Sequence, residues 1–222
     1  MNPFEEGQVI LVNKPLRWTS ADVVKKIRNR IHVKVGHAGT LDPLATGLLI
    51  LCTGKFTKKI NEYMSKEKEY TGTFTLGATT ASYDLETLPE NIKDYGHINE
   101  EALQEAAKKF TGEIIQVPPI YSAIKKNGER SYDLARQGRA VTLEGRKIFI
   151  REFEMNIQQL PFISFRVICS TGTYIRSLAN DVGQLLGCGA YLSSLCRTRI
   201  GEFLLENAID PESAEIKFKT DN

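Results

Sequence analysis

The 222-residue sequence predicts an α+β fold with a mixed, mostly antiparallel central sheet that is flanked by helices. Stretches with helical periodicity alternate along the chain with stretches of strand character, which is typical of a domain that contains both. The apolar runs at 148–157 and 162–169 are separated only by Gln158 to Pro161, which indicates an antiparallel pair of strands. No repeat, low-complexity segment or linker divides the chain, so we expect one domain over residues 1–222.

The N-terminal third is predicted to contain three strands and two helices. A short apolar strand at 9–12 ends at Asn13-Lys14-Pro15, and Thr19 or Ser20 can cap the helix that follows. That helix is amphipathic, because its apolar face (Val23, Val24, Ile27, Ile31) excludes its basic residues (Lys25, Lys26, Arg28, Arg30). A continuous apolar run predicts a buried strand at 48–53, a helix follows at 55–64, and alternation predicts a strand at 69–76.

The rest of the chain continues the alternation of helices and strands. The acidic stretch from Thr80 to Gly96 has no clear period and is predicted to be a surface excursion. Asn99 caps a helix that stops before Gly112, and the two prolines after Gln116 predict a stiff, extended segment. The final elements are a short helix around 132–136 inside a loop, the strand pair, a helix that starts near Ile175 and is closed by Gly187, and a strand at 199–205.

Several classes of function find no support in the composition. The four cysteines are scattered without a CxxC pair, and the three histidines are not spaced as metal ligands. We therefore expect no disulfide framework and no metal site, and a reducing cytoplasm is the simplest setting. No apolar run approaches the ~20 residues of a membrane span, and residues 1–8 do not resemble a secretory signal. A glycine-rich phosphate loop is also missing, so no nucleotide cofactor is expected.

Charge is distributed unevenly over a chain whose net charge is only +2. Residues 14–37 contain seven Lys and Arg against one acid, and residues 125–151 contain eight against three. Residues 80–105 have the opposite character, with seven acids and one lysine. The basic blocks could be ordinary solvated surface, but together they favour a positive face that binds a polyanion.

The stretch from Gly36 to Gly47 (GHAGTLDPLATG) is the most constrained part of the sequence. Its glycines and proline predict a tightly shaped loop, in the middle of which stands one carboxylate, Asp42. Asp42 could simply cap its own turn, or it could be a nucleophile, a base or a metal ligand, although metal-assisted chemistry would need more ligands than the neighbouring sequence offers. Glycosidic hydrolysis would need a second carboxylate, and no spacing rule pairs Asp84 or Asp181 with it. The pattern leaves a single, rigidly presented aspartate whose expected partner is a cation.

Two further positions could contribute chemistry. Tyr70 lies on the alternating strand, where it is either a core aromatic or a ring that stacks on a base or moves a proton. The segment from Thr171 to Arg176 lies where a strand passes into a helix, whose N-terminus favours anions. Arg176 falls outside the apolar face of that helix, so it is available to pair with a carboxylate. The alternative is a surface arginine that pairs with Asp181 or only with solvent.

Five motifs in this order resemble the TruB family of tRNA pseudouridine synthases, and the resemblance extends from about Val9 to Phe203. Residues 36–47 resemble the family's catalytic-aspartate motif, and Lys68-Glu69-Tyr70 with Leu76-Gly77 resembles its tyrosine motif. Residues 118–125 (PPIYSAIK), with Tyr132, Ala135 and Arg136, resemble the start of an RNA-binding insertion, which we place at about 118–146. Residues 172–178 (GTYIRSL) resemble the arginine motif, and Leu195-Cys196-Arg197-Thr198 resembles the closing Leu-Arg-Arg-Thr motif.

The resemblance implies an enzyme that converts uridine-55 in the T-loop of tRNA to pseudouridine. The base leaves ribose at N1, turns, and is rejoined through C5, so no cofactor is required. As implied by the family, Asp42 is the nucleophile or otherwise acts at the ribose or base, Tyr70 stacks on the base and assists proton transfer, and Arg176 pairs with the aspartate. The target uridine has to be flipped out of its stack, and His37 resembles the residue that props the flipped loop nucleotides. The other residues expected to contact substrate are Tyr174, Asp84, Lys14, Leu195, Lys125, Tyr132 and Arg136.

Some features of the family pattern stay open. Many members carry a C-terminal PUA domain, and the 19 residues after Phe203 are too few for one, so we expect none in this chain. The sequence around Asp84 departs from the usual Thr-Asp-Thr, although we still expect Asp84 to be a partner of Arg176. The atom that Asp42 attacks could be C6 of the base or C1′ of ribose, or the reaction could eliminate through C2′. The expected partner is the tRNA T-arm and the expected state a monomer; the alternatives are another RNA substrate or a non-catalytic tRNA-binding module.

Overall fold

The computed structural model describes residues 2–122, 125–126, 129–130 and 143–213. They form two compact units, which are described separately: unit 1 comprises residues 1–70 and 196–222, and unit 2 comprises residues 71–195. Strand β4 (Lys68–Leu76) and strand β10 (Ala190–Ile200) each contain a boundary between the units. The expectation of one domain over 1–222 stays a prediction.

Unit 1 is built on strand β3 (Ala45–Thr53). Strand β1 (Val9–Lys14) pairs antiparallel with β3 from Val9↔Cys52 to Lys14↔Gly47, and β2 (Val35–His37) pairs with its end. The C-terminal part of β10 turns back into β11 (Phe203–Leu204), followed by the 3₁₀ turn η2 (Leu205–Asn207). The short helix α1 (Pro3–Glu6), whose N-cap is Asn2, precedes β1.

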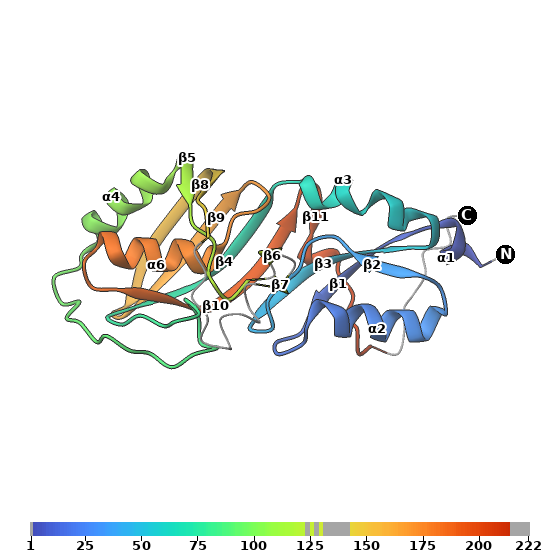
Figure 1. Cartoon of the computed structure of the whole chain (residues 1–222), viewed down its shortest axis with the longest axis horizontal. Helices are drawn as coiled ribbons and strands as arrows, with labels where there is room; N and C mark the ends of the chain where they lie inside the picture. Colours follow the sequence, from blue (N-terminus) through green and yellow to red (C-terminus); the bar gives the residue numbers. More distant parts are fainter. Residues whose placement is uncertain (1, 123–124, 127–128, 131–142, 214–222) are drawn as a thin grey trace. The chain divides into compact units, whose positions relative to one another are not determined.

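The alternation of side chains along β3 creates an apolar layer on each face of the sheet in unit 1. Leu49 and Leu51 pack with α2 (Ser20–Ile31), which covers one face, whereas Leu48 and Ile50 pack toward the other face (Figure 1). That second face is covered by the 3₁₀ turn η1 (Gly54–Lys59) and by α3 (Ile60–Ser65). The prediction of a helix over 55–64 is wrong in its first half, because residues 54–59 form a 3₁₀ turn that contains no buried side chain.

Unit 2 contains the strand order β4-β9-β8-β5, with β8 (Arg146–Gln159), β9 (Phe162–Cys169) and β5 (Gly112–Gln116). The β8–β9 and β5–β8 pairs are antiparallel. Helices α4 (Glu100–Phe110) and α6 (Ile175–Leu185) lie together on one side of these strands (Figure 1). A two-residue ladder, β6 (Lys125–Lys126) with β7 (Glu129–Arg130), stands apart from the sheet.

The α+β class with a largely antiparallel sheet is confirmed, and most predicted elements are present. Residues 80–96 form turns and isolated bridges, but the predicted surface excursion is only partly confirmed, because Thr80, Ser82 and Asp84 are buried. The final strand is the main correction, because it runs from 190 to 200 with a separate β11 rather than from 199 to 205. Strand β5 was not predicted, since Ile115 points outward and hides the alternation. The short helix expected at 132–136 lies outside the described residues.

Candidate active site

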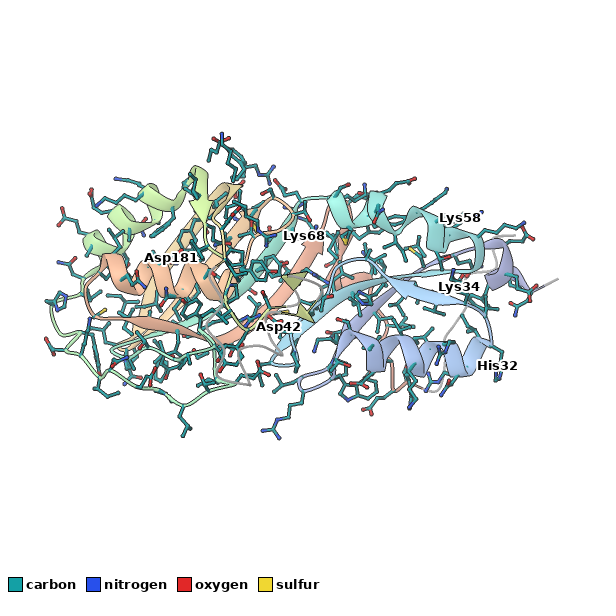
Figure 2. The ribbon with its side chains drawn as sticks, in the orientation of Figure 1. His32, Lys34, Asp42, Lys58, Lys68 and Asp181 are labelled. Atoms are coloured by element: carbon teal, nitrogen blue, oxygen red, sulfur yellow. The ribbon has the colours of Figure 1, made fainter. Side chains whose placement is uncertain are left out.

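Asp42 stands in a turn between β2 and β3 (Figure 2). The amide of Ala45 donates to the carbonyl of Asp42 at 3.0 Å, which closes the turn around Pro43. Gly39 and Gly47 take φ values of +92° and +103°, which are favourable only for glycine. The backbone therefore has the tightly shaped form that the glycines and proline predicted.

Ser20, the first residue of α2, fastens the loop just before Asp42. The amide of Leu41 donates to Ser20 Oγ at 2.9 Å, and that hydroxyl lies 3.3 Å from the Leu41 carbonyl. The cap of α2 is Thr19, which accepts from the amide of Asp22 while the Asp22 carboxylate accepts from the Thr19 amide. Because this capping box satisfies the helix start, the Ser20 hydroxyl is available to the loop.

Lys14 stabilises the loop through its side chain, which is fully buried (0% exposed). Its ammonium donates to the carbonyls of Pro15 at 2.9 Å, Trp18 at 2.6 Å and, more weakly, Pro43 at 3.5 Å. Burial lowers the pKa of Lys14 to about 8, and the negative charge of Asp42 opposes this shift. The ammonium predicted to contact substrate thus has its donors directed at the backbone beside Asp42.

Arg197 connects the two ends of the loop. Its side chain is only 1% exposed, and it donates from Nε to the Leu48 carbonyl at 2.8 Å and from Nη2 to the Gly39 carbonyl at 3.1 Å. Gly47 lies directly against the Arg197 backbone, where a Cβ would be 2.4 Å from the carbonyl oxygen. Sequence reasoning placed Arg197 in the closing motif, outside the strand predicted at 199–205, and gave it no role.

His37 ends β2, where it pairs with Leu51 of β3. Its ring is partly buried, and burial lowers the pKa of His37 below 6.5, with a further contribution from the positive charge of Arg197. The imidazole is therefore neutral at pH 7. A neutral ring can pack against a base without bringing a charge into the site.

Tyr70 lies within β4 and is buried, on the same side of the strand as Phe74 and Leu76. Lys68, at the start of β4, donates to the carbonyls of Met64 at 2.5 Å and Lys66 at 2.6 Å, so it closes the end of α3 (Figure 2). The strand that carries Tyr70 is thereby fixed to the preceding helix.

In unit 2, Arg176 is the second residue of α6, and its side chain is only 4% exposed. Its Nη1 donates to the carbonyls of Tyr121 at 2.9 Å and Ser82 at 3.3 Å, and its Nε lies 3.7 Å from Asp84 Oδ2. Asp84 is buried as well, and it accepts from the amide of Glu86 at 3.0 Å. The structure thus brings together Arg176 and Asp84, whose roles stay predictions.

Tyr174 precedes α6 and is held through its backbone. The side-chain amide of Gln116 accepts from the Tyr174 amide at 2.8 Å and donates to its carbonyl at 3.1 Å. The Arg146 guanidinium lies over the Tyr174 ring, 4.8 Å from its centre, in a cation–π contact. Ser177 Oγ donates to the Val117 carbonyl at 2.8 Å, so the proline-containing segment is tied to the start of α6. Gln116 was not predicted as a site residue.

The predicted residues divide between the two units. Asp42, His37, Tyr70 and Lys14 belong to unit 1, whereas Arg176, Asp84, Tyr174, Leu195 and Lys125 belong to unit 2. Leu195 is partly buried on β10, and Lys125 pairs with Arg130 in the β6–β7 ladder. Tyr132 and Arg136 lie outside the described residues. The pairing of Asp42 with Arg176 would join the units, and it stays a prediction.

Asp181, the other carboxylate considered as a partner for Asp42, projects from α6 in unit 2 (Figure 2). Burial raises the pKa of Asp181, and burial also raises the pKa of Tyr83, with a further contribution from the negative charge of Asp181. Among the described residues, no group of three or more His, Cys, Asp or Glu side chains could hold a metal ion. No helix in the described part of the chain is long and apolar enough to cross a membrane.

Comparisons with known proteins agree on one family. The profile described as "TruB family pseudouridylate synthase (N terminal domain)" matches residues 25–175. The chain is 54% identical to "tRNA pseudouridine synthase B" of Flavobacterium johnsoniae over 95% of this chain and 96% of that protein. It is 47% identical to the protein of the same name from Chlorobaculum tepidum, over 94% of this chain and 90% of that protein.

Solved structures support the assignment of the fold. A structure titled "Crystal Structure of a Cbf5-Nop10-Gar1 Complex" matches with a TM-score of 0.72 and 32% identity, over 93% of this chain and 53% of that one. Another, titled "Structure of H/ACA RNP bound to a substrate RNA containing 2'-deoxyuridine", matches with a TM-score of 0.69 and 29% identity, over 93% of this chain and 51% of that one. The chain spans about half the length of these two proteins. With the profile match and the relatives that align over nearly their full length, the chain belongs to the TruB family of pseudouridylate synthases.

Proposed function

We propose that this enzyme converts uridine-55 in the T-loop of tRNA to pseudouridine. The observation that carries the proposal is the support given to Asp42, whose loop is fastened by Ser20, Lys14 and Arg197. A loop that only had to turn the chain would not need two buried cations beneath it. The names of the relatives, "tRNA pseudouridine synthase B", support tRNA as the substrate.

The reaction needs no group beyond the enzyme and the RNA. The N1–C1′ bond breaks, the base turns, and a C5–C1′ bond forms, while the proton leaves C5 and N1 ends with a proton. Asp42 acts as the nucleophile, either at C6 of the base or at C1′ of ribose, or its carboxylate takes part in an elimination through C2′. In each case it has to be ionised, and the Lys14 ammonium is a nearby positive charge that interacts favourably with it.

The remaining catalytic roles go to Tyr70 and Arg176. The Tyr70 ring stacks on the flipped uracil, and its hydroxyl assists the proton transfer at C5. Arg176 pairs with Asp42 during the reaction. Its Nη1 donates to two carbonyls and its Nε lies 3.7 Å from Asp84 Oδ2 in an ion pair, so the guanidinium has few orientations to lose on pairing.

RNA binding is assigned to the T-arm, with the enzyme acting as a monomer. His37, neutral at pH 7, props the loop nucleotides that surround the flipped base. Tyr174, Leu195, Lys125, Tyr132 and Arg136 contact the RNA, and the basic blocks supply the phosphate contacts that position it. Lys14 contributes indirectly, because its ammonium shapes the Asp42 loop.

The test is pseudouridine formation on an unmodified tRNA transcript, with wild type compared with Asp42→Asn. A matched control is Asp94→Asn, which makes the same change on the exposed excursion of unit 2. We expect Asp42→Asn to abolish conversion while RNA binding persists, and Asp94→Asn to behave as wild type. Equal conversion by wild type and Asp42→Asn would refute the assignment of Asp42 as the nucleophile. Binding without conversion by wild type would favour a non-catalytic tRNA-binding module.

A further inference from the structure

The outer side of α2 carries a hollow of about 320 Å³ that contains none of the predicted active-site residues. Its lining side chains come from the residue before the helix cap and from successive turns of the helix: Trp18, Asp22, Lys25, Lys26 and Asn29. This volume lies at the lower end of the range of small-ligand pockets, roughly 300–1,000 Å³. The hollow combines an aromatic ring, two ammonium groups and a side-chain amide.

The ring of Trp18 is restrained by packing and does not rotate freely at the surface. It is partly buried and packs against the apolar layer formed by β1, β3 and α2. Its carbonyl accepts from the Lys14 ammonium at 2.6 Å, and its amide donates to the Pro15 carbonyl at 3.4 Å. These bonds fix the backbone of Trp18, and the packing of its ring against the apolar layer restrains the side chain, so the ring can stack on a planar ligand at little cost in side-chain entropy.

The charge in the hollow favours an anion. Among the described residues, neither Lys25 nor Lys26 forms an ion pair or a hydrogen bond, although Lys25 interacts favourably at longer range with Asp22. The acid in the lining is already engaged, since Asp22 Oδ2 accepts from the Thr19 amide at 2.9 Å and the Thr19 hydroxyl at 2.6 Å. These bonds lower the pKa of Asp22 and direct its carboxylate to the helix start. The two ammonium groups are therefore the available charges.

We propose that this hollow binds one nucleotide of the RNA substrate, with its base stacked on Trp18 and its flanking phosphates held by Lys25 and Lys26. Asn29 lies one helical turn beyond Lys25 and Lys26, where its amide can pair with a base edge. This contact extends the proposed function, on which it rests, to a nucleotide other than the target uridine. Aromatic rings with flanking cations are the usual platform for unpaired bases.

Trp18 is the only tryptophan in the chain, so its fluorescence reports directly on this hollow. We expect an unmodified tRNA transcript to quench it with saturation at the binding constant obtained from labelled RNA. Heparin, which carries negative charge but no bases, should compete for binding without the same quenching. A transcript that binds without changing the fluorescence would overturn the proposal, and so would quenching by heparin equal to that by RNA.

Substitution tests the charges separately. We expect Lys25→Ala/Lys26→Ala to weaken binding of the transcript about tenfold or more and to reduce the slope of log Kd against log salt by about 1 for each phosphate that is no longer neutralised. The matched control is Lys108→Ala/Lys109→Ala, an adjacent pair of exposed lysines in the last turn of α4 in unit 2. Trp18→Phe keeps a stacking ring in the apolar layer, and we expect it to bind more weakly than wild type but more tightly than Trp18→Leu.

These results separate this inference from the proposed function. Equal affinities for the Lys25/Lys26 and Lys108/Lys109 variants would overturn the inference, while pseudouridine formation by wild type would leave the function standing. If wild type forms no pseudouridine but the transcript quenches Trp18 and the two variants differ as expected, the function fails and the nucleotide contact stands. Circular dichroism of each variant establishes that it is folded before its affinity is compared.

Discussion

Two glycines in the Asp42 loop provide a matched test of how tightly the loop is held. Gly39 and Gly47 both have φ in the left-handed region, at +92° and +103°. A Cβ at Gly39 would meet only Arg197 Nη1, at 3.6 Å, which is an ordinary contact. A Cβ at Gly47 would lie 2.4 Å from the carbonyl oxygen and 2.7 Å from the amide nitrogen of Arg197. The two substitutions to alanine share the backbone strain and differ in the space available.

The expected magnitudes follow from this difference. A left-handed alanine costs about 1–2 kcal/mol, which applies at both positions. At Gly47 the contact of 2.4 Å is also about 1 Å too short, and overpacking of this kind costs roughly a further 1–3 kcal/mol. We therefore expect the free energy of unfolding to fall by about 1–2 kcal/mol for Gly39→Ala and by about 2–5 kcal/mol for Gly47→Ala.

Urea unfolding measures these losses, and single-turnover conversion of the transcript measures their consequence for chemistry. Because Gly47 can accept a Cβ only if β3 or β10 moves, we expect Gly47→Ala to displace the loop and reduce turnover on the order of 100-fold. Gly39→Ala should have a smaller effect on both quantities. Equal loss of unfolding free energy in the two variants would refute the inference that Arg197 closely confines the loop at Gly47.

Three further perturbations test the charges around the site. We expect Arg176→Lys to reduce turnover more than RNA affinity, because one ammonium cannot keep the contacts of Arg176 to two carbonyls and Asp84. The control is Arg166→Lys, at a partly exposed ion pair with Glu152, and equal turnover in both variants would contradict the role of Arg176. The pKa of Lys14 is about 8 in the folded chain against 10.5 unfolded, so the unfolded chain binds more protons between these values. Relative to Lys14→Met, the free energy of unfolding of wild type should rise with pH over this window, and Asp42→Asn should shift the start of the window to lower pH; parallel pH profiles would show that Lys14 is not perturbed. RNA affinity should fall steeply with salt, as counterion release requires, and a flat response would mean that the basic blocks do not contact the RNA.

Elements with a clear period could be predicted from the sequence. The apolar positions of α2, α4 and α6 recur at helical spacing, and the caps Thr19 and Asn99 mark where two of these helices begin. The alternation in β4, β8 and β9 was equally informative. In each case the local pattern and the buried face agree, and such agreement makes an element recognisable without tertiary information.

The elements that were missed take their form from tertiary contacts. Strand β10 has buried, partly buried and exposed side chains without strict alternation, and it contains the buried Arg197. Strand β5, with the sequence GEIIQ, exposes Ile115 and buries Gln116. A charged core residue and an exposed apolar one both contradict the hydrophobic pattern on which sequence reasoning depends.

Candidate site residues could be named from the sequence where a motif marks them, and their catalytic roles stay predictions; partners that lie far along the chain could not be named. Asp42 and Arg176 were found from their motifs, and the ion pair of Arg176 with Asp84 is present. The supports of the Asp42 loop were not predicted: Ser20 lies 21 residues before Leu41, and Arg197 lies 158 residues after Gly39. Spacing along the sequence carries no information about such distant hydrogen bonds.

The central claim is that Asp42 isomerises one uridine of the T-loop, and mapping the product on tRNA tests it most directly. An unmodified transcript is incubated with wild type or Asp42→Asn, and pseudouridine is located along the whole RNA by its selective chemical labelling. We predict pseudouridine at position 55 with wild type, none with Asp42→Asn, and none with either protein when position 55 is changed to cytidine. Pseudouridine at position 55 with Asp42→Asn, or at another position with wild type, would contradict the account.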